Sequence, residues 1–179
     1  EDICKIYISL YPNNIVYITK EHGGTSSARN CGISYIQGEY VNFMDSDDII
    51  SPNMFSEVVA FFNCFDVDIV SVPIYRFDGR KGDHPLNYKY KNGTQIIDLN
   101  KDPDAIQLSI SSAFVPVHIA KKIRFDTRLA FAEDAKVILK ILGRERKLGV
   151  ISNCKYMYRL RTSGNPSALQ EGPDDPKWY

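Results

Sequence analysis

Several patterns that mark particular classes of protein are absent from this sequence. No apolar run approaches the ~20 residues that a membrane-spanning helix needs, and no signal-peptide pattern is seen at its start. The four cysteines include no C-x-x-C pair, so neither a zinc site nor a disulfide framework is indicated. The 22 acidic and 22 basic residues balance, which argues against a general nucleic-acid surface. We therefore expect a cytoplasmic protein, free or held peripherally at the inner face of a membrane, with no nucleic-acid partner.

The composition that is present fits one globular domain. With 179 residues, of which 44% are hydrophobic, the chain can bury a core of its own. Neither an internal repeat nor a low-complexity linker divides it. We expect a single domain over residues 1–179, in which residues 170–179 form a tail.

Apolar residues recur with alternating helical and strand periods along the chain. Helices are predicted over residues 3–10, 26–36, 52–62, 103–108 and 133–142. Strands are predicted over residues 15–19, 40–44, 67–73, 113–117, 148–151 and 156–160. Residues 74–99 are polar and aromatic and contain the turn signals Asp78-Gly79 and Asn92-Gly93, so they predict a hairpin-like insertion. The alternation predicts an α/β fold with a mostly parallel sheet, flanking helices and this small antiparallel excursion.

A cluster of carboxylates follows the strand predicted over residues 40–44. Residues just past a strand's carboxyl end in an α/β sheet face the crevice where ligands bind. Asp45 and Asp47 are two positions apart, so in extended chain their side chains project to the same side, and their hard oxygens suit Mg²⁺ or Mn²⁺. The alternative is a polar turn before the next helix, with Ser51 as N-cap and Pro52 at the first helical position.

The helix predicted from Ser26 follows two glycines and carries an arginine. Free backbone N–H groups and the positive end of the helix dipole attract phosphate at such a position. Arg29 adds a forked cation that can grip a phosphate or a sugar oxygen. The alternative is that Arg29 is a surface residue on a capped helix.

Taken in order, these segments resemble the inverting family 2 glycosyltransferases of the GT-A fold. The matching pieces are Gly24, Ala28-Arg29-Asn30-Cys31-Gly32, Gly38-Glu39-Tyr40 and Asp45-Ser46-Asp47-Asp48. Three later segments are similar to the family's Arg-Phe-x, Glu-Asp and Tyr-x-Tyr-Arg segments: Lys122-Ile123-Arg124-Phe125-Asp126, Ala132-Glu133-Asp134 and Lys155-Tyr156-Met157-Tyr158-Arg159. The likeness extends over roughly residues 3–169.

The resemblance implies a partial, Rossmann-like GT-A fold and an inverting enzyme, which we expect to be bacterial. It would move a hexosyl or N-acetylhexosaminyl group from a nucleotide-diphosphate donor, expected to be a UDP-sugar, to a hydroxyl of a surface glycan or polymer. Gly24, Arg29, Asn30 and Asp45 are expected to bind the donor. Asp45 and Asp47 are expected to hold Mn²⁺ or Mg²⁺. The insertion at residues 74–99 would lie on the acceptor side.

Two acidic residues begin the helix predicted over residues 133–142. The resemblance assigns the catalytic base to Asp134, which would take the proton of the acceptor hydroxyl, and acceptor binding to Glu133. The residues alone leave a simpler alternative, because the helix dipole favours acidic side chains in the first turn. Relatives often carry a histidine two residues after the late Tyr-Arg pair, where this chain has Arg161. We expect Arg161 to neutralise the donor diphosphate instead of binding a metal.

The usual beginning of the family is missing from this chain. Members usually start with two apolar strands that hold the nucleotide base, and we expect this chain to be truncated after them. The strands predicted over residues 15–19 and 40–44 would then have unpaired edges, which favour self-association. Two other functions stay open: a non-catalytic remnant that binds a glycan or a partner, and a phosphatase with an aspartyl nucleophile after the same strand.

Overall fold

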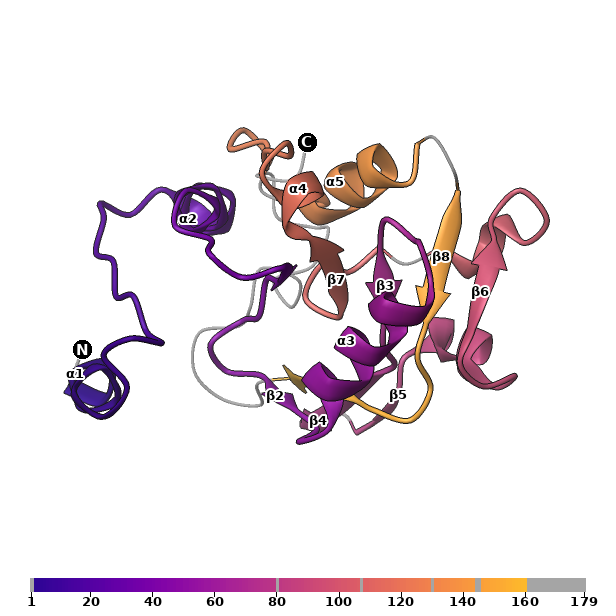
Figure 1. Ribbon diagram of the computed structural model, residues 1–179, viewed down its shortest axis with the longest axis horizontal. Helices are drawn as coiled ribbons and strands as arrows, with labels where there is room; N and C mark the ends of the chain where they lie inside the picture. Colours follow the sequence, from indigo (N-terminus) through magenta and orange to yellow (C-terminus); the bar gives the residue numbers. More distant parts are fainter. Residues whose placement is uncertain (1, 80, 107, 130, 144–145, 161–179) are drawn as a thin grey trace.

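The structure, a computed structural model, describes residues 2–79, 81–106, 108–129, 131–143 and 146–160. Its strands form two sheets (Figure 1). The five-stranded sheet has the order β1 (Tyr40–Asn42), β7 (Ala113–Pro116), β3 (Val70–Ser71), β8 (Lys147–Val150) and β6 (Gln95–Asp98). The four-stranded sheet has the order β2 (Ile49–Ile50), β9 (Tyr156–Leu160), β4 (Ile74–Asp78) and β5 (Gly82–Asp83).

Four of the five described α-helices lie close to positions predicted from the apolar periodicity, and the fifth, over residues 117–120, was not predicted. The five are α1 (Asp2–Leu10), α2 (Gly24–Ile33), α3 (Met54–Cys64), α4 (Val117–Ala120) and α5 (Glu133–Ile141). Two short 3-10 helices, η1 (Pro85–Tyr90) and η2 (Pro103–Ala105), lie between β5 and β7. The acidic first turn of α5 and the glycine soon after its end are the helix start and stop signals expected there.

The α/β class with flanking helices is confirmed, but the expectation of a mostly parallel sheet needs correction. Five of the seven pairings between described strands are antiparallel. β1, β3 and β8 do run in one direction, and α3 and α5 lie in the connections that lead into β3 and β8. β7 and β6 run the opposite way and are reached through loops and 3-10 helices. A parallel pairing usually needs a crossover helix between the two strands, so strands reached without one pair antiparallel with their neighbours here.

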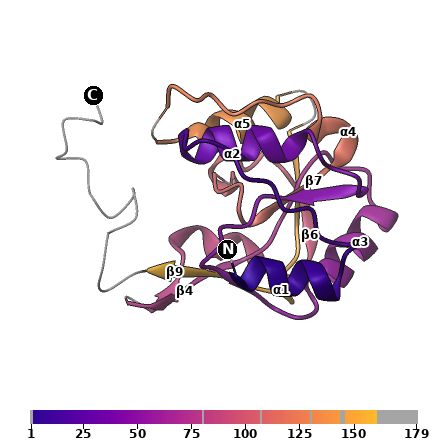
Figure 2. The same cartoon turned by 90° about the vertical axis from the view of Figure 1, so that its left-hand side faces the viewer.

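The core consists of two apolar clusters, one on each face of the five-stranded sheet. Alternate residues of β7 divide between them: Ala113 and Val115 lie in one cluster and Phe114 in the other. α2 and α5 cover the first cluster, whereas α3 covers the second. Figure 2 shows α2 and α5 together on one side of the molecule.

Two predicted elements are wrong in type. Residues 15–19 form no strand, and Val16 and Tyr17 are exposed. In the part of the chain that is described, no strand runs beside them, so their alternating apolar pattern has neither a hydrogen-bonded neighbour nor a core to cover. The helix predicted over residues 103–108 is only the short η2, because the backbone becomes extended again at Ile106.

The insertion predicted over residues 74–99 is partly confirmed. β4 and β5 pair antiparallel around a turn that includes Asp78-Gly79, which is the predicted hairpin. β6, however, leaves the insertion and pairs with β8 in the larger sheet. The insertion is therefore joined to both sheets.

α1 is open to solvent, and β1 lies at an edge of its sheet. No residue of α1 is buried, and the helix stands apart from both sheets in Figure 1. β1 has one partner, β7, among the described strands and so lies at an edge of its sheet. Self-association through this edge stays a prediction. None of the described helices is both long and apolar enough to cross a membrane.

Gly149 gives a direct test of how closely α3 packs on β8. A Cβ added there would lie 2.6 Å from Phe61 Cε1 and 2.9 Å from Val70 Cγ2. We expect Gly149→Ala to lower the free energy of unfolding by about 1–3 kcal/mol, because one of these side chains must move. Urea unfolding followed by circular dichroism measures the change.

Gly32→Ala is the matched control for this test. Its added Cβ would meet nothing within 4 Å, and alanine is a better helix former than glycine. We expect Gly32→Ala to be neutral or stabilising. Equal stability of Gly149→Ala and the unaltered protein would contradict the close contact at β8.

Candidate functional site

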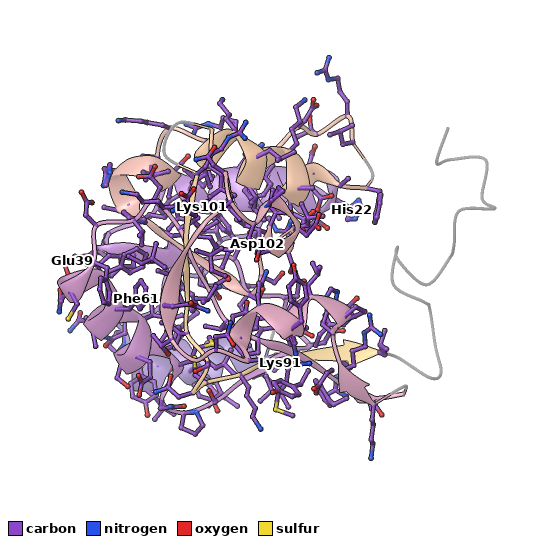
Figure 3. The ribbon with its side chains drawn as sticks, turned by 90° about the vertical axis from the view of Figure 1, so that its right-hand side faces the viewer. His22, Glu39, Phe61, Lys91, Lys101 and Asp102 are labelled. Carbon is purple, nitrogen blue, oxygen red and sulfur yellow. The ribbon has the colours of Figure 1, made fainter. Side chains whose placement is uncertain are left out.

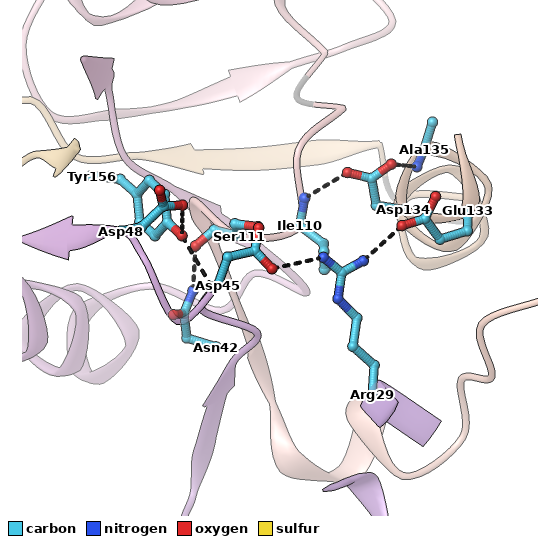
Figure 4. A network of polar contacts seen from close by, with 10 residues as sticks. All are labelled: Arg29, Asn42, Asp45, Asp48, Ile110, Ser111, Glu133, Asp134, Ala135 and Tyr156. Carbon is cyan, nitrogen blue, oxygen red and sulfur yellow. Dashed lines mark hydrogen bonds and ion pairs between the residues drawn. The ribbon is translucent and has the colours of Figure 1, made fainter. Parts of the chain in front are cut away.

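Asp45 lies just beyond β1, where three other segments reach its carboxylate and its backbone (Figure 4). Asp45 Oδ1 accepts from Arg29 Nη2 at 3.4 Å, and Oδ2 accepts from the Ser111 hydroxyl at 3.2 Å. The Asp45 backbone N–H donates to the Tyr156 hydroxyl at 3.3 Å. Asp45 therefore contacts three segments: α2, the residues just before β7, and β9.

Arg29 bridges Asp45 and Glu133. Its Nη1 donates to Glu133 Oε1 at 2.9 Å, and its guanidinium also lies over the Phe125 ring, 5.3 Å from the ring centroid. The side chains of Arg29 and Glu133 are only 11% and 16% exposed, so this ion pair is screened less than a surface pair. The end of β1 is therefore held close to the first turn of α5.

Asp134 follows Glu133 and turns its carboxylate toward backbone N–H groups. Its Oδ1 accepts from the N–H of Ala135 at 2.9 Å, and its Oδ2 accepts from the N–H of Ile110 at 3.4 Å. Ile110 is next to Ser111 in sequence, so one short segment contacts both Asp45 and Asp134. Figure 4 shows the two carboxylates on either side of this segment.

Asp48 is the most deeply buried carboxylate of the cluster that follows β1. The Tyr156 hydroxyl donates to its Oδ2 at 2.6 Å, and the backbone N–H of Arg159 donates to its Oδ1 at 2.8 Å. Burial raises the pKa of Asp48, and the charges of Asp45 and Asp47 act in the same direction, against these two hydrogen bonds, which lower it. Burial and the bond to Asp48 also raise the pKa of Tyr156 far above its ordinary value. Asp48 therefore anchors the loop to β9.

The backbone of the same loop is held at Asp47. Arg159 Nε donates to the carbonyl of Asp47 at 2.9 Å, while Arg159 Nη1 pairs with Asp78 at 3.0 Å. Asp78 ends β4, so the β4–β5 hairpin is linked through Arg159 to the carboxylate cluster. The side chain of Asp47 is half-buried.

Asp45 and Asp47 are the predicted ligands of a divalent cation, and their chemistry fits one. Two hard carboxylate oxygens suit Mg²⁺ or Mn²⁺ when phosphates and water supply the remaining ligands. Both oxygens of Asp48 are engaged with β9, and both oxygens of Asp45 also accept hydrogen bonds, from Arg29 and Ser111. Within the described ranges, no group of three or more His, Cys, Asp and Glu side chains is arranged to hold a metal by itself. These residues fit a cation that is shared with a bound diphosphate.

The surroundings of the remaining predicted site residues, Gly24, Asn30 and Arg161, differ from one to the next. Gly24 begins α2 with φ +75°, and a Cβ added there would meet nothing within 4 Å, so the backbone is open at this point. Asn30 uses its whole amide within the protein, since it donates to the carbonyl of Phe125 and accepts from its N–H, both at 2.8 Å. Arg161 lies outside the described residues.

The structure adds residues that the sequence interpretation missed. Ser111 contacts Asp45 through its hydroxyl, and its carbonyl accepts from Asn42 Nδ2 at 2.7 Å. No local pattern marks Ser111, because its role depends on the pairing of β7 with β1. Tyr156 did carry a signal, since it belongs to the late Tyr-x-Tyr-Arg segment, but its partner Asp48 could be found only from the fold.

A comparison with protein families shows which family the chain belongs to. The model of the family described as "Glycosyl transferase family 2" matches residues 1–123. The chain belongs to this family. The resemblance noted in the sequence is thereby confirmed, and the phosphatase alternative is set aside.

Two curated relatives are proteins of Bacillus subtilis (strain 168). "Minor teichoic acid biosynthesis protein GgaB" is 41% identical over 181 residues, which cover 100% of this chain and 20% of GgaB. "Minor teichoic acid biosynthesis protein GgaA" is 34% identical over 181 residues, which cover 99% of this chain and 39% of GgaA. The chain therefore spans less than half the length of these two relatives.

Solved structures of TarS from S. aureus share the fold. TarS 1-349 in complex with UDP aligns with a TM-score of 0.73 at 23% identity, covering 87% of this chain and 47% of that one. TarS 1-349 in complex with UDP-GlcNAc also gives a TM-score of 0.73, at 21% identity, covering 92% and 48%. At these identities the likeness establishes the fold, which agrees with the expected GT-A class.

The buried contact between Tyr156 and Asp48 can be tested by removing one hydroxyl. Tyr156→Phe leaves a buried carboxylate oxygen without its donor and the Asp45 N–H without this acceptor, so we expect the free energy of unfolding to fall by about 1–3 kcal/mol. Thermal and urea unfolding measure the loss. Tyr158→Phe, which removes a hydroxyl from the same strand outside this contact, should change stability by less. Equal effects of the two variants would show that the Asp48 contact contributes nothing specific.

Proposed function

We propose that this chain is a sugar-transferring domain that uses a UDP-sugar and acts on a hydroxyl of a teichoic acid or a related cell-envelope polymer. The donor class is supported by the TarS structures, which are complexes with UDP and with UDP-GlcNAc. The acceptor class is supported by GgaB and GgaA, whose names refer to teichoic acid biosynthesis. Family membership supports the transfer reaction itself.

The observation that carries this proposal is the Arg29 bridge between Asp45 and Glu133. Glu133 is 104 residues from Arg29 in sequence and Asp45 is 16 residues from it, yet one guanidinium contacts both carboxylates. A transferase of this class needs the group that faces the donor diphosphate close to the group that faces the acceptor. The two ends of the Arg29 bridge meet that requirement.

Asp134 is the general base of the proposed reaction. It would take the proton of the acceptor hydroxyl as the hydroxyl oxygen attacks the anomeric carbon and the bond to the diphosphate breaks, which inverts the configuration in a single displacement. Two backbone N–H groups fix the orientation of its carboxylate. Glu133, held by Arg29, would bind the acceptor beside it.

In this proposal the donor diphosphate would lie at Asp45 and Asp47. The open backbone at Gly24 would also face the donor. A Mg²⁺ or Mn²⁺ ion held there would offset the negative charge of the departing diphosphate, a contribution of several kcal/mol in metal-assisted sites. Arg29 gives the same region a fixed positive charge. Asn30 is not part of the proposed donor site, because its amide is hydrogen-bonded to the backbone of Phe125.

Asp134→Asn tests the assignment of the base. The variant keeps the size of the side chain but cannot accept the proton, so turnover of UDP-sugar should fall by ~10² or more. Binding of UDP should stay near that of the unaltered protein. Product formation by chromatography and UDP binding by calorimetry measure the two quantities.

Asp66→Asn, a change at an exposed carboxylate outside the site, is the control for this experiment. Near-normal turnover by Asp134→Asn would remove Asp134 from the chemistry. UDP-sugar binding without turnover by the unaltered protein, with every acceptor polymer supplied, would favour the non-catalytic alternative.

Asp47→Ala tests the metal assignment. If Asp45 and Asp47 share a cation with the diphosphate, Mn²⁺ should strengthen UDP binding by the unaltered protein, and this dependence should be lost in the variant. Calorimetric titration of UDP with and without Mn²⁺ measures it, with Asp66→Ala as the control. The metal assignment fails if Asp47→Ala keeps the full effect of Mn²⁺.

A further inference from the structure

Lys89 is a buried lysine that the proposed reaction does not use. It lies in η1, within the insertion, and is only 4% exposed. Its Nζ donates to the carbonyl of Ala105 at 3.1 Å and lies 5.5 Å from the centroid of the Tyr90 ring. A lysine is rarely buried to this degree without a specific partner. The contact joins the insertion to the segment that leads into β7.

Ala105, which Lys89 holds, is followed a few residues later in sequence by residues of the candidate site. Ala105 is itself fully buried in the core, and Ile110 is equally buried five residues later. The N–H of Ile110 donates to Asp134, and the next residue, Ser111, donates to Asp45. Ala105 is therefore held by the ammonium group, and Ile110 and Ser111, a few residues later, contact the carboxylates of Asp134 and Asp45.

The neighbouring tyrosine keeps η1 itself in place. The Tyr90 hydroxyl donates to Ser71 Oγ at 3.0 Å, and Tyr90 is buried in the core. Ser71 belongs to β3, the middle strand of the five-stranded sheet. Lys89 thus projects from a segment that is anchored to the sheet, so it is able to act as a fixed point for Ala105.

We propose that Lys89 is a positioning residue for Asp134 and Asp45, and that it acts through its hold on Ala105, five residues before Ile110. The effect on Asp134 is the larger one, because the Ile110 N–H is one of two backbone donors to that carboxylate. Asp45 has further contacts with Arg29 and Tyr156. The part of this proposal that concerns turnover rests on the proposed transferase function, whereas the part that concerns the backbone does not.

Because Lys89 is titratable, the pH dependence of its contact with Ala105 gives a second way to test its role. Burial lowers the pKa of Lys89 to about 8, and the carboxylate of Asp102 acts in the opposite direction. Lys89 in turn acts on His84, whose own pKa is lowered, first by burial and then by Arg76 and Lys89, so this imidazole is neutral at pH 8. As the pH rises through about 8, Lys89 loses its charge and its bond to Ala105 is no longer charge-assisted. The restraint on Ala105 therefore weakens on the alkaline side.

Hydrogen exchange tests the backbone part. In Lys89→Met, the Ile110 amide should exchange about tenfold faster than in the unaltered protein, while the amide of Ile151, bonded to Ser71 within the sheet, should keep its rate. Lys91→Met, an exposed lysine two residues later, is the matched control. Lys91 and Asp102, both labelled in Figure 3, mark the two segments that Lys89 joins.

Turnover tests the functional part. Lys89→Met should lower kcat about tenfold to a hundredfold with little change in UDP binding, and Lys89→Arg, which keeps the charge, should recover part of the loss. Unchanged Ile110 exchange and unchanged kcat in a folded Lys89→Met protein would overturn the proposal. Faster exchange in a protein that shows no transfer at all would count against the proposed function and not against the Lys89 contact.

A pair of surface variants keeps the test decisive if Lys89→Met does not fold. Asp102→Asn removes the charge that raises the pKa of Lys89, so the alkaline decline of turnover and of Ile110 protection should begin at lower pH. Asp104→Asn removes an exposed charge two residues away, which acts on Tyr88, and should leave that midpoint where it is. Identical alkaline midpoints in the two variants would overturn the role of the Lys89 ammonium group.

Discussion

The antiparallel pairing of β7 with β1 determines where the candidate site forms. Because the two strands run in opposite directions, the end of β1 lies beside the start of β7, with Asn42 opposite Phe114. The residues that precede β7 are thereby brought to the carboxylates that follow β1. Asn42 fixes this arrangement by donating to the carbonyls of Ser111 and Ala113, and the Ser111 hydroxyl then reaches Asp45. A parallel neighbour would have placed the opposite end of its strand there.

Local periodicity was sufficient to predict several elements of this fold. β9 has the predicted bounds, and α5 begins at the predicted residue, because both carry a strong apolar pattern with clear start or stop signals. Strand direction was not predictable in the same way, since it depends on how the connection between strands folds. The pattern of residues 15–19 also failed, because a strand exists only with a neighbour and no described strand lies beside it.

The candidate site was predictable as a set of residues but not as a set of contacts. Arg29, Asp45 and Glu133 were each singled out from motifs, and the structure brings their side chains together. Arg29 was expected to contact a ligand, whereas its guanidinium is paired with two carboxylates of the protein. If the donor binds at Asp45 as proposed, it would meet a cation that is already partly neutralised, and binding would have to rearrange or extend an existing ion pair. Lys89 lies in the insertion and carried no motif, so only its burial reveals it.

The open position of α1 has a consequence for the colloidal behaviour of the protein. Several large apolar side chains of this helix face outward, among them Ile3, Ile6 and Leu10. The whole chain has a formal net charge of zero at pH 7, so long-range repulsion between molecules is weakest near neutrality. Attraction between such exposed patches is then least opposed. Solubility should accordingly pass through a minimum near neutral pH and increase as the pH is moved to either side.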